Sequence, residues 1–267
     1  MSRVVRLVGL PLLLGALLLP FLPLLLWAAA ERYPFPALLP QTTSSRPLRV
    51  LVDPGSDVLS GLVNSTVIAL AVAAVASLVG LATGRALGLH RFRGRRLVQF
   101  LLLAPVVVPG IAVTLGIQVF FIRYQLADTR AGVVLVHLLA AVPYVCLVMS
   151  SVYANLDLRM EEQARTLGAG PLQVLLRITL PAVAPGLAVA ALFAFLISWG
   201  EYVLTLLVGG GAVQTLPLLL YSSLGSADTP LAAALALALV LPPVLLLALT
   251  SRFLSGGRTP LAGFGRV

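Results

Sequence analysis

Long apolar runs are the feature that most restricts what this chain can fold into. Six of them have about the 20 residues that a helix needs to cross the roughly 30 Å of hydrocarbon in a bilayer. They cover residues 7–30, 59–87, 97–122, 131–153, 182–208 and 231–250. In lipid each span must satisfy its own backbone hydrogen bonds, which favours helices. We therefore expect an all-α membrane protein with six transmembrane helices.

The composition agrees with a membrane location. The chain is 60% hydrophobic and 10% charged, which leaves too little polar surface to cover a soluble domain of 267 residues. The first run follows Arg3 and Arg6 and resembles a secretory signal, but its apolar stretch exceeds the roughly 7–15 residues of a signal core. We interpret it as a retained span.

The positive charges predict the orientation of the spans. All 18 basic residues are arginine. With the amino terminus inside, 13 of them fall on the inner side and five on the outer side, so the positive-inside bias places both termini in the cytoplasm. Topology and contact with anionic membrane lipid account for the net charge of +9, and we expect no nucleic-acid partner.

Missing residue types exclude several chemistries. Without lysine the chain has no Walker A loop and no Schiff-base site. His90, His137 and the single Cys146 are too few for a metal site made by this chain alone. We interpret His137 as a packed residue that bonds between helices. The sequence predicts no enzyme activity, metal or cofactor of its own.

A polar connector, "EEQARTLGAGPLQVLLRITLP", lies between the fourth and fifth runs at residues 161–181. We expect the fourth helix to continue to Gly168, which stops it, and Pro171 to begin a second, short helix. Pro181 should end that helix. Its apolar positions follow the i, i+3, i+4, i+7 spacing of an amphipathic helix: Leu172, Leu175, Leu176 and Thr179.

The connector resembles the EAA loop of importer-type ABC transporter permeases, written E-A-A-x3-G-x9-I-x-L-P. The positions that match this pattern are Glu162, Ala164, Gly168, Ile178, Leu180 and Pro181. Gln163 stands where the pattern has its first alanine. The resemblance covers roughly residues 59–251, and its motif has six identities at two fixed gaps.

This resemblance implies a transport subunit in a bacterial inner membrane, with ATP bound by a partner. The helix that contains Pro171, Leu172, Leu175, Leu176 and Ile178 would dock on a separate ATPase, of which two copies are expected. Further implied partners are a second permease subunit, homologous or identical, and an extracytoplasmic solute-binding protein that docks around residues 31–58 and 208–230. We expect residues 1–58 to form the first span and an outer loop, 59–251 the permease core, and 252–267 a cytoplasmic tail.

Candidate residues for the translocation pathway lie in two spans. "SWGEYVLT" at residues 198–205 resembles permeases for polyamines, ferric iron and thiamine, and it places the acidic Glu201, with Tyr202 beside it, inside the fifth span. Pro105 and Pro109 would bend the third span and free carbonyls toward a pathway. The alternatives are a subunit-interface role for Glu201 and a packed kink at the prolines.

The predicted function is therefore uptake of a small solute, with a polyamine or another cation favoured by the carboxylate of Glu201. Ferric iron, thiamine or an oxyanion are the alternative solutes. Rival classes are an intramembrane enzyme, for which a paired serine and histidine or acidic motifs are missing, and a secondary transporter, which would not need the connector helix.

Overall fold

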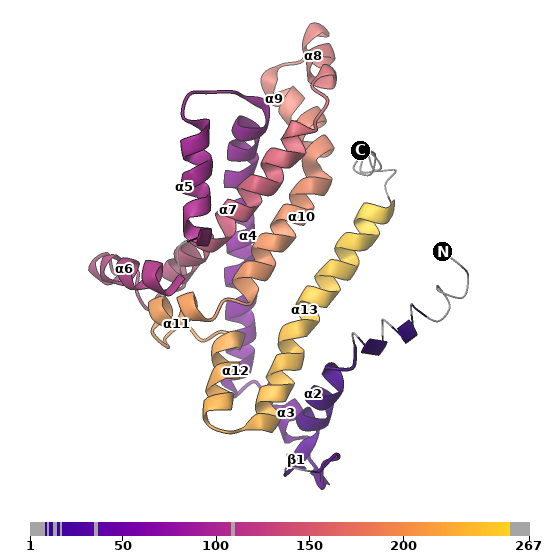
Figure 1. The fold of residues 1–267 in the computed structure, drawn as a ribbon, viewed down its shortest axis with the longest axis vertical. Coiled ribbons are helices and arrows are strands. Elements are labelled where there is room, and N and C mark those ends of the chain that lie inside the picture. The colour runs from indigo at the N-terminus through magenta and orange to yellow at the C-terminus, as the bar shows by residue number, and fades with distance from the viewer. Residues whose placement is uncertain are drawn as a thin grey trace. The chain divides into compact units, whose positions relative to one another are not determined.

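Helices form nearly all of the described chain (Figure 1). The structure is a computed structural model that describes residues 9, 11–12, 15–16, 18–34, 37–107 and 110–256. The short helices outside the connector are α2 (Phe21–Ala28), α3 (Arg46–Val52), α11 (Val203–Gly209) and α12 (Leu216–Gly225). Strands β1 (Ala30–Arg32) and β2 (Thr42–Thr43) pair antiparallel, with Ala30 opposite Thr43.

Four described helices are long and apolar enough to cross a membrane. They are α4 (Asp57–Leu89), α7 (Arg130–Ala154), the helix over Pro171–Trp199 that contains α10 (Leu180–Trp199), and the Thr229–Thr250 part of α13 (Thr229–Gly256). These four correspond to the second, fourth, fifth and sixth predicted runs. The first predicted run falls partly outside the described residues.

The third predicted run folds as two helices. The first, α5, covers Arg95–Val107 and contains Pro105, whereas α6 covers Gly110–Arg123. Figure 1 shows the two helices running in different directions. The bend predicted for the third span is therefore present, but the run forms two separate helices and not one bent helix. The change of direction lies within a few residues of Pro105, whose ring removes a helical hydrogen bond.

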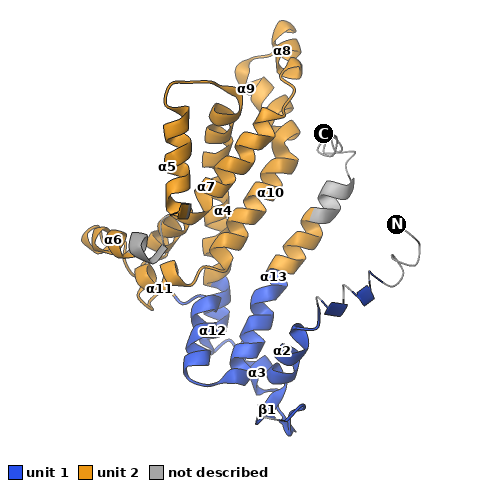
Figure 2. Ribbon diagram, in the orientation of Figure 1, with its two compact units in different colours: residues 1–63, 214–242 blue, residues 64–213, 243–267 orange. Residues whose placement is uncertain are grey.

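The chain divides into two compact units, coloured separately in Figure 2. The first contains residues 1–63 and 214–242, and the second contains residues 64–213 and 243–267. In the first unit, Ala28 packs with Ala233 and Ala234. Arg46 and Asp228 form a salt bridge there with a nitrogen to oxygen distance of 2.7 Å.

The centre of the second unit is α7, which packs against α5, α10 and α11. Seven of its ten buried residues form one stripe along the helix, with most of them three or four positions apart: Val133, Val136, His137, Ala141, Val145, Met149 and Tyr153. Phe121 of α6 and Val208 of α11 join Val136 in one apolar cluster.

Close backbone approach joins α4 to α7 within this unit. A methyl group added at Gly84 would lie 2.8 Å from the carbonyl carbon of Met149, and one at Gly88 would lie 2.6 Å from the carbonyl oxygen of Ser150. An added methyl at Gly80 would overlap Val145. These glycines, four residues apart, let the two helices pack at short range, as small residues do in membrane helix pairs.

Candidate functional site

The polar connector begins with a break that the sequence analysis did not predict. The fourth span was expected to continue to Gly168, but α7 ends at Ala154 and a separate helix, α8, covers Arg159–Thr166. Two short polar side chains explain the break. The Asn155 amide donates to the carbonyl of Ser151 at 2.8 Å, and the Asp157 carboxylate accepts from the backbone of Arg159 at 3.0 Å. Such local bonds compete with helix continuation.

Gly168 ends α8 as predicted. Its φ of +86° lies in the left-handed region. Its N–H donates to the carbonyl of Arg165, and the N–H of Ala169 donates to the carbonyl of Ala164, both at 3.0 Å. This pair of bonds is a Schellman motif, which satisfies carbonyls at the end of the helix. The conformation favours glycine because it carries no steric cost there.

The second half of the connector begins as predicted and continues further. Pro171 is the first residue of α9 (Pro171–Val174), and the side-chain oxygen of Gln173 accepts from the backbone of Gly170 at 3.1 Å. A π-helical turn over Leu175–Thr179 then leads directly into α10. The helix is therefore continuous through Pro181, and the prediction that Pro181 ends it is wrong.

The π-helical turn explains how the helix passes a proline. Pro181 has no N–H to donate, and its ring would crowd the carbonyl four residues before it in a regular α-helix. In the π-turn the N–H of Leu180 bonds to the carbonyl of Leu175, five residues earlier. The helical path widens just before the proline, and Pro181 then occupies the first turn of α10, where a proline is tolerated.

The three leucines of the predicted apolar face are turned outward, whereas its fourth position, Thr179, is buried. Leu172, Leu175 and Leu176 are 65%, 43% and 53% exposed, and Leu167 in the preceding turn is 88% exposed. Val174 is buried instead. Of the remaining motif residues, Glu162 and Pro181 are exposed, while Ala164, Ile178 and Leu180 are half-buried. The connector therefore presents leucines on its surface.

A buried carboxylate next to the motif was missed by the sequence analysis. Glu161 is 4% exposed. The Arg85 guanidinium donates to both of its oxygens, at 2.8 and 2.7 Å, and the Thr179 hydroxyl donates to one of them at 2.6 Å. Arg165, one turn along α8, lies 3.7 Å away. We call Arg85, Glu161 and Thr179 the Glu161 cluster.

The cluster holds Glu161 in its ionised form. Bonding from Arg85 and, to a smaller extent, Thr179 lowers the pKa of the carboxyl from 4.5 to about 2. The ionised form therefore stabilises the fold above pH 4.5, and this stabilisation is lost as the pH falls toward 2. Two features of the sequence could have indicated this ion pair. The motif uses only Glu162 of the two adjacent carboxylates, which leaves Glu161 without an assigned role. Arg85 is a charged residue within the apolar run that becomes α4.

The fifth span ends earlier than predicted. It was expected to continue to Val208, but α10 ends at Trp199 and α11 begins at Val203. Glu201 is therefore not inside a span helix. It lies half-buried in the break, where its carboxylate accepts from the backbone N–H of Leu204 at 3.1 Å and caps α11. Tyr202 is half-buried next to it.

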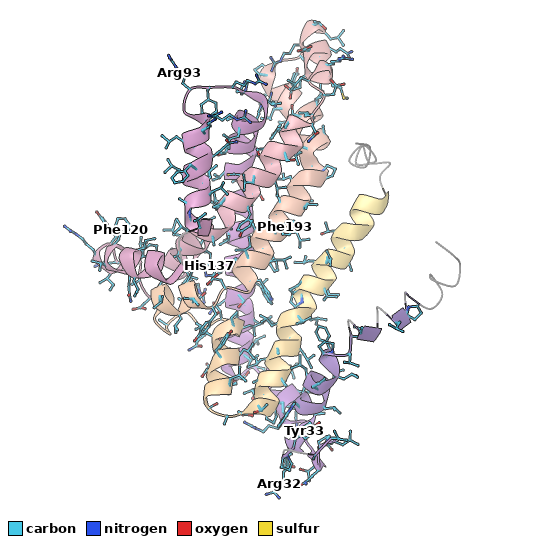
Figure 3. The ribbon with its side chains drawn as sticks, viewed as in Figure 1. Arg32, Tyr33, Arg93, Phe120, His137 and Phe193 are labelled. Atoms are coloured by element: carbon cyan, nitrogen blue, oxygen red, sulfur yellow. The ribbon has the colours of Figure 1, made fainter. Side chains whose placement is uncertain are left out.

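His137 bonds to both sides of this break, as the interhelical role predicted (Figure 3). Its Nδ1 lies 2.8 Å from the Ser198 hydroxyl and its Nε2 lies 2.9 Å from the Thr205 hydroxyl. Thr205 donates its proton to the carbonyl of Glu201 at 3.0 Å, so it must accept from Nε2–H. Nδ1 then accepts from Ser198 in the neutral imidazole.

The proline candidates are only partly described. Pro105 is half-buried within α5, and Pro109 lies outside the described residues. Gln118 of α6 donates to the carbonyl of Leu207 in α11 at 3.4 Å, so it connects these two helices.

Comparison with known proteins gives a family match over most of the chain. Residues 76–255 match the family model described as "Binding-protein-dependent transport system inner membrane component". This range contains the connector, the Glu161 cluster and the break at Glu201.

Three named relatives are 29–33% identical to this chain over the aligned regions. ORF1 of Streptomyces antibioticus, whose name describes an ABC transporter permease protein, is 30% identical over 73% of this chain and 86% of its own length. The spermidine/putrescine transport system permease protein PotC of Haemophilus influenzae is 29% identical over 72% of this chain and 75% of its own. The putrescine transport system permease protein PotI of Escherichia coli is 33% identical over 62% of this chain, which spans 61% of PotI.

A solved structure has a similar fold. It belongs to a bacterial ABC transporter involved in the import of the acidic polysaccharide alginate. The aligned region covers 95% of this chain and 98% of that one, with a TM-score of 0.69 and 20% sequence identity. At this identity the likeness concerns the fold.

Proposed function

The chain belongs to the family of binding-protein-dependent transport system inner membrane components, and we propose that its connector, residues 161–181, couples it to a separate ATPase. It is a multi-pass inner membrane protein and the permease component of an ABC importer, and it is not itself an enzyme. In the proposal it forms half of the translocation pathway, beside a second permease subunit that is homologous or identical.

The observation that carries this proposal is the outward-facing apolar surface of the connector. Leu167, Leu172, Leu175 and Leu176 are all exposed, and the exposed polar residues Gln173 and Arg177 lie among and after them in the sequence. Exposed leucines in such a position mark a protein contact. A partner that covers them gains about 2 kcal/mol for each leucine that it buries.

The helix that contains these leucines can transmit a displacement. It has 29 residues from Pro171 to Trp199 and is therefore about 43 Å long, which exceeds the hydrocarbon thickness of about 30 Å. Its first turns, which contain the leucines, project beyond the lipid. A partner that moves these turns also moves the membrane part of the same continuous helix.

The proposed topology places the connector and both termini in the cytoplasm, where two ATPase subunits would bind ATP. The arginines of the α4–α5 loop support this orientation, because the positive-inside bias places such a loop in the cytoplasm. Arg93 extends from that loop (Figure 3). The extracytoplasmic solute-binding protein would then dock on the opposite side, around residues 31–58 and 208–230. The Arg46–Asp228 salt bridge supports this site by joining the two segments.

The proposed solute is a polyamine or a similar small cation. Two relatives carry polyamine substrates in their names, and a half-buried carboxylate, Glu201, lies in a helix break of the family-matched region. Breaks in membrane helices are places where transporters contact their solutes. We assign Glu201 and Tyr202 to the pathway in this proposal, together with the bend near Pro105 and Pro109.

The test is the triple variant Leu172→Ala, Leu175→Ala, Leu176→Ala, assembled with its partner subunits in liposomes. Loss of the docking leucines should lower uptake of radiolabelled putrescine by more than about tenfold, while the protein still inserts and folds. The matched control is Leu97→Ala, Leu101→Ala, Leu115→Ala, since these leucines are 60%, 59% and 54% exposed but lie outside the connector. Equal uptake by the two triple variants would exclude the proposed coupling role.

A further inference from the structure

We propose that the Glu161 cluster is a positioning device that makes the connector and the inner end of α4 move as one body. This inference rests on the proposed coupling function and extends it to a second span. The proposed docking surface lies on the helix that leads into α10, and nothing in that helix alone explains how α4 would follow. The Glu161 cluster supplies the link.

The cluster joins three elements at one carboxylate. Glu161 comes from α8, Arg85 from the last turns of α4, and Thr179 from the end of the π-helical turn. Arg85 and Glu161 meet through two parallel bonds of 2.8 and 2.7 Å. A two-point contact between planar groups fixes direction as well as distance. Consequently, α8 cannot rotate or slide along α4 without breaking both bonds.

The Thr179 bond closes the connector on itself. Thr179 lies 18 residues after Glu161, and its hydroxyl donates to the carboxylate at 2.6 Å. The two helices of the connector, α8 and the one that starts at Pro171, are therefore hydrogen-bonded to each other at the ends that lie furthest from the turn. Between them, added methyl groups at Gly168 and Gly170 would meet nothing within 4 Å. The turn has no close neighbours at these two positions, whereas the opposite end of the connector is bonded to Arg85 of α4.

Burial makes this tie stronger than a surface ion pair. The side chains of Glu161 and Arg85 are 5% and 29% exposed. A partly desolvated, doubly bonded pair is costly to break because one charge would be left buried without its partner. The Arg85 guanidinium also lies over the ring of Tyr153, 5.8 Å from its centre, so the end of α7 restrains the same group. A displacement of the connector leucines is thus transmitted to α4 while the bonds of the Glu161 cluster stay intact.

Asp157 provides the contrast that makes the inference testable. It is an exposed carboxylate four residues before Glu161 and outside the connector, and an asparagine there would keep the side-chain oxygen that accepts from the backbone of Arg159. If this region only needed a carboxylate for solubility, the two positions would respond alike. The cluster predicts that Glu161, and not Asp157, controls the ratio of solute transported to ATP hydrolysed.

The experiment measures that ratio in liposomes that contain the assembled transporter, with putrescine and its binding protein. Glu161→Gln and Thr179→Val should lower the number of putrescine molecules transported per ATP by about tenfold, the size of a typical coupling between sites. ATP hydrolysis itself should continue. Asp157→Asn should keep the wild-type ratio. The exchanged pair Arg85→Glu, Glu161→Arg should recover part of the ratio that Glu161→Gln loses, which a general loss of folding would not show.

A second measurement needs no knowledge of the solute. Spin labels at His90→Cys and Thr166→Cys, both exposed positions near the cluster, are introduced with Cys146→Ser. In the wild type the distance between the labels should stay the same with and without ATP and vanadate. In Glu161→Gln the distribution of label distances should become broad, and its mean should depend on the nucleotide.

The inference is overturned if Glu161→Gln keeps both the wild-type transport ratio and a constant label distance while the leucine triple variant loses uptake. If the leucine triple variant also keeps full uptake, the proposed coupling function itself is wrong. If Glu161→Gln does not fold, Thr179→Val and the exchanged pair decide between these outcomes.

Discussion

Gly168 shows how one residue sets the geometry of the proposed coupling site. Its φ of +86° ends α8 and turns the chain toward α9. Gly170, two residues later, has a φ of −69° and a ψ of 161°, an extended conformation that other residues adopt freely. The two glycines lie in the same turn, but only the position of Gly168 requires a left-handed backbone conformation.

Gly168→Val should therefore impair coupling, while Gly170→Val should not. A side chain in the left-handed region costs about 1–2 kcal/mol, and a β-branched one is the least suited to it. We expect Gly168→Val to lower putrescine uptake several-fold, measured in liposomes that contain the assembled transporter. Gly168→Asn should retain most of the uptake, because asparagine tolerates this region. The same loss in Gly170→Val would show that backbone geometry is not the cause.

At the scale of elements, the second unit depends on how closely α4 approaches α7. Gly80, Gly84 and Gly88 face Val145, Met149 and the Ser150–Tyr153 segment, so the two helices meet backbone to backbone. This contact also places Arg85, between two of these glycines, within reach of Tyr153 and Glu161. The helix pairing is thus the support on which the Glu161 cluster is built.

Gly84→Val should destabilise the protein by separating these helices. The added atoms would meet backbone of α7 at 2.8 Å, and overpacking of this kind costs about 1–3 kcal/mol. Thermal unfolding in detergent should show a lower midpoint. Gly116→Val in α6 is the matched control, because it places the same side chain on a helix where nothing lies within 4 Å. Similar midpoints for both variants would mean that the close approach contributes little.

At the scale of the whole molecule, the proposed topology makes a separate prediction. The single native thiol, Cys146, is buried, so exposed cysteines can be introduced one at a time together with Cys146→Ser. Thr166→Cys in α8 should react with a membrane-impermeant maleimide only after the inner face is opened to the reagent. Gln41→Cys, exposed near β2, should react from outside in intact cells. Labelling of Thr166→Cys from outside would reverse the assigned orientation and remove the coupling proposal with it.

Local patterns in the sequence determined the membrane class and the turn of the connector. Apolar runs are read directly as helices, because in lipid each helix satisfies its backbone within one segment, and four of the predicted runs are long helices. The stop at Gly168 and the start at Pro171 were also predictable, since both depend on the conformation of a single residue. The family match over residues 76–255 agrees with the motif at Glu162, Gly168 and Pro181.

Only the tertiary structure decided which residues meet across distant segments. Glu161 and Arg85 are 76 positions apart, and their pairing depends on the packing of α4 against α7, which no local pattern specifies. The structure likewise showed that Pro181 lies inside a continuous helix and that Glu201 caps α11 instead of lying within a span. The sequence thus determined which segments become helices, because that choice is local. Where those helices break and what they hold together depended on contacts between segments far apart in the chain.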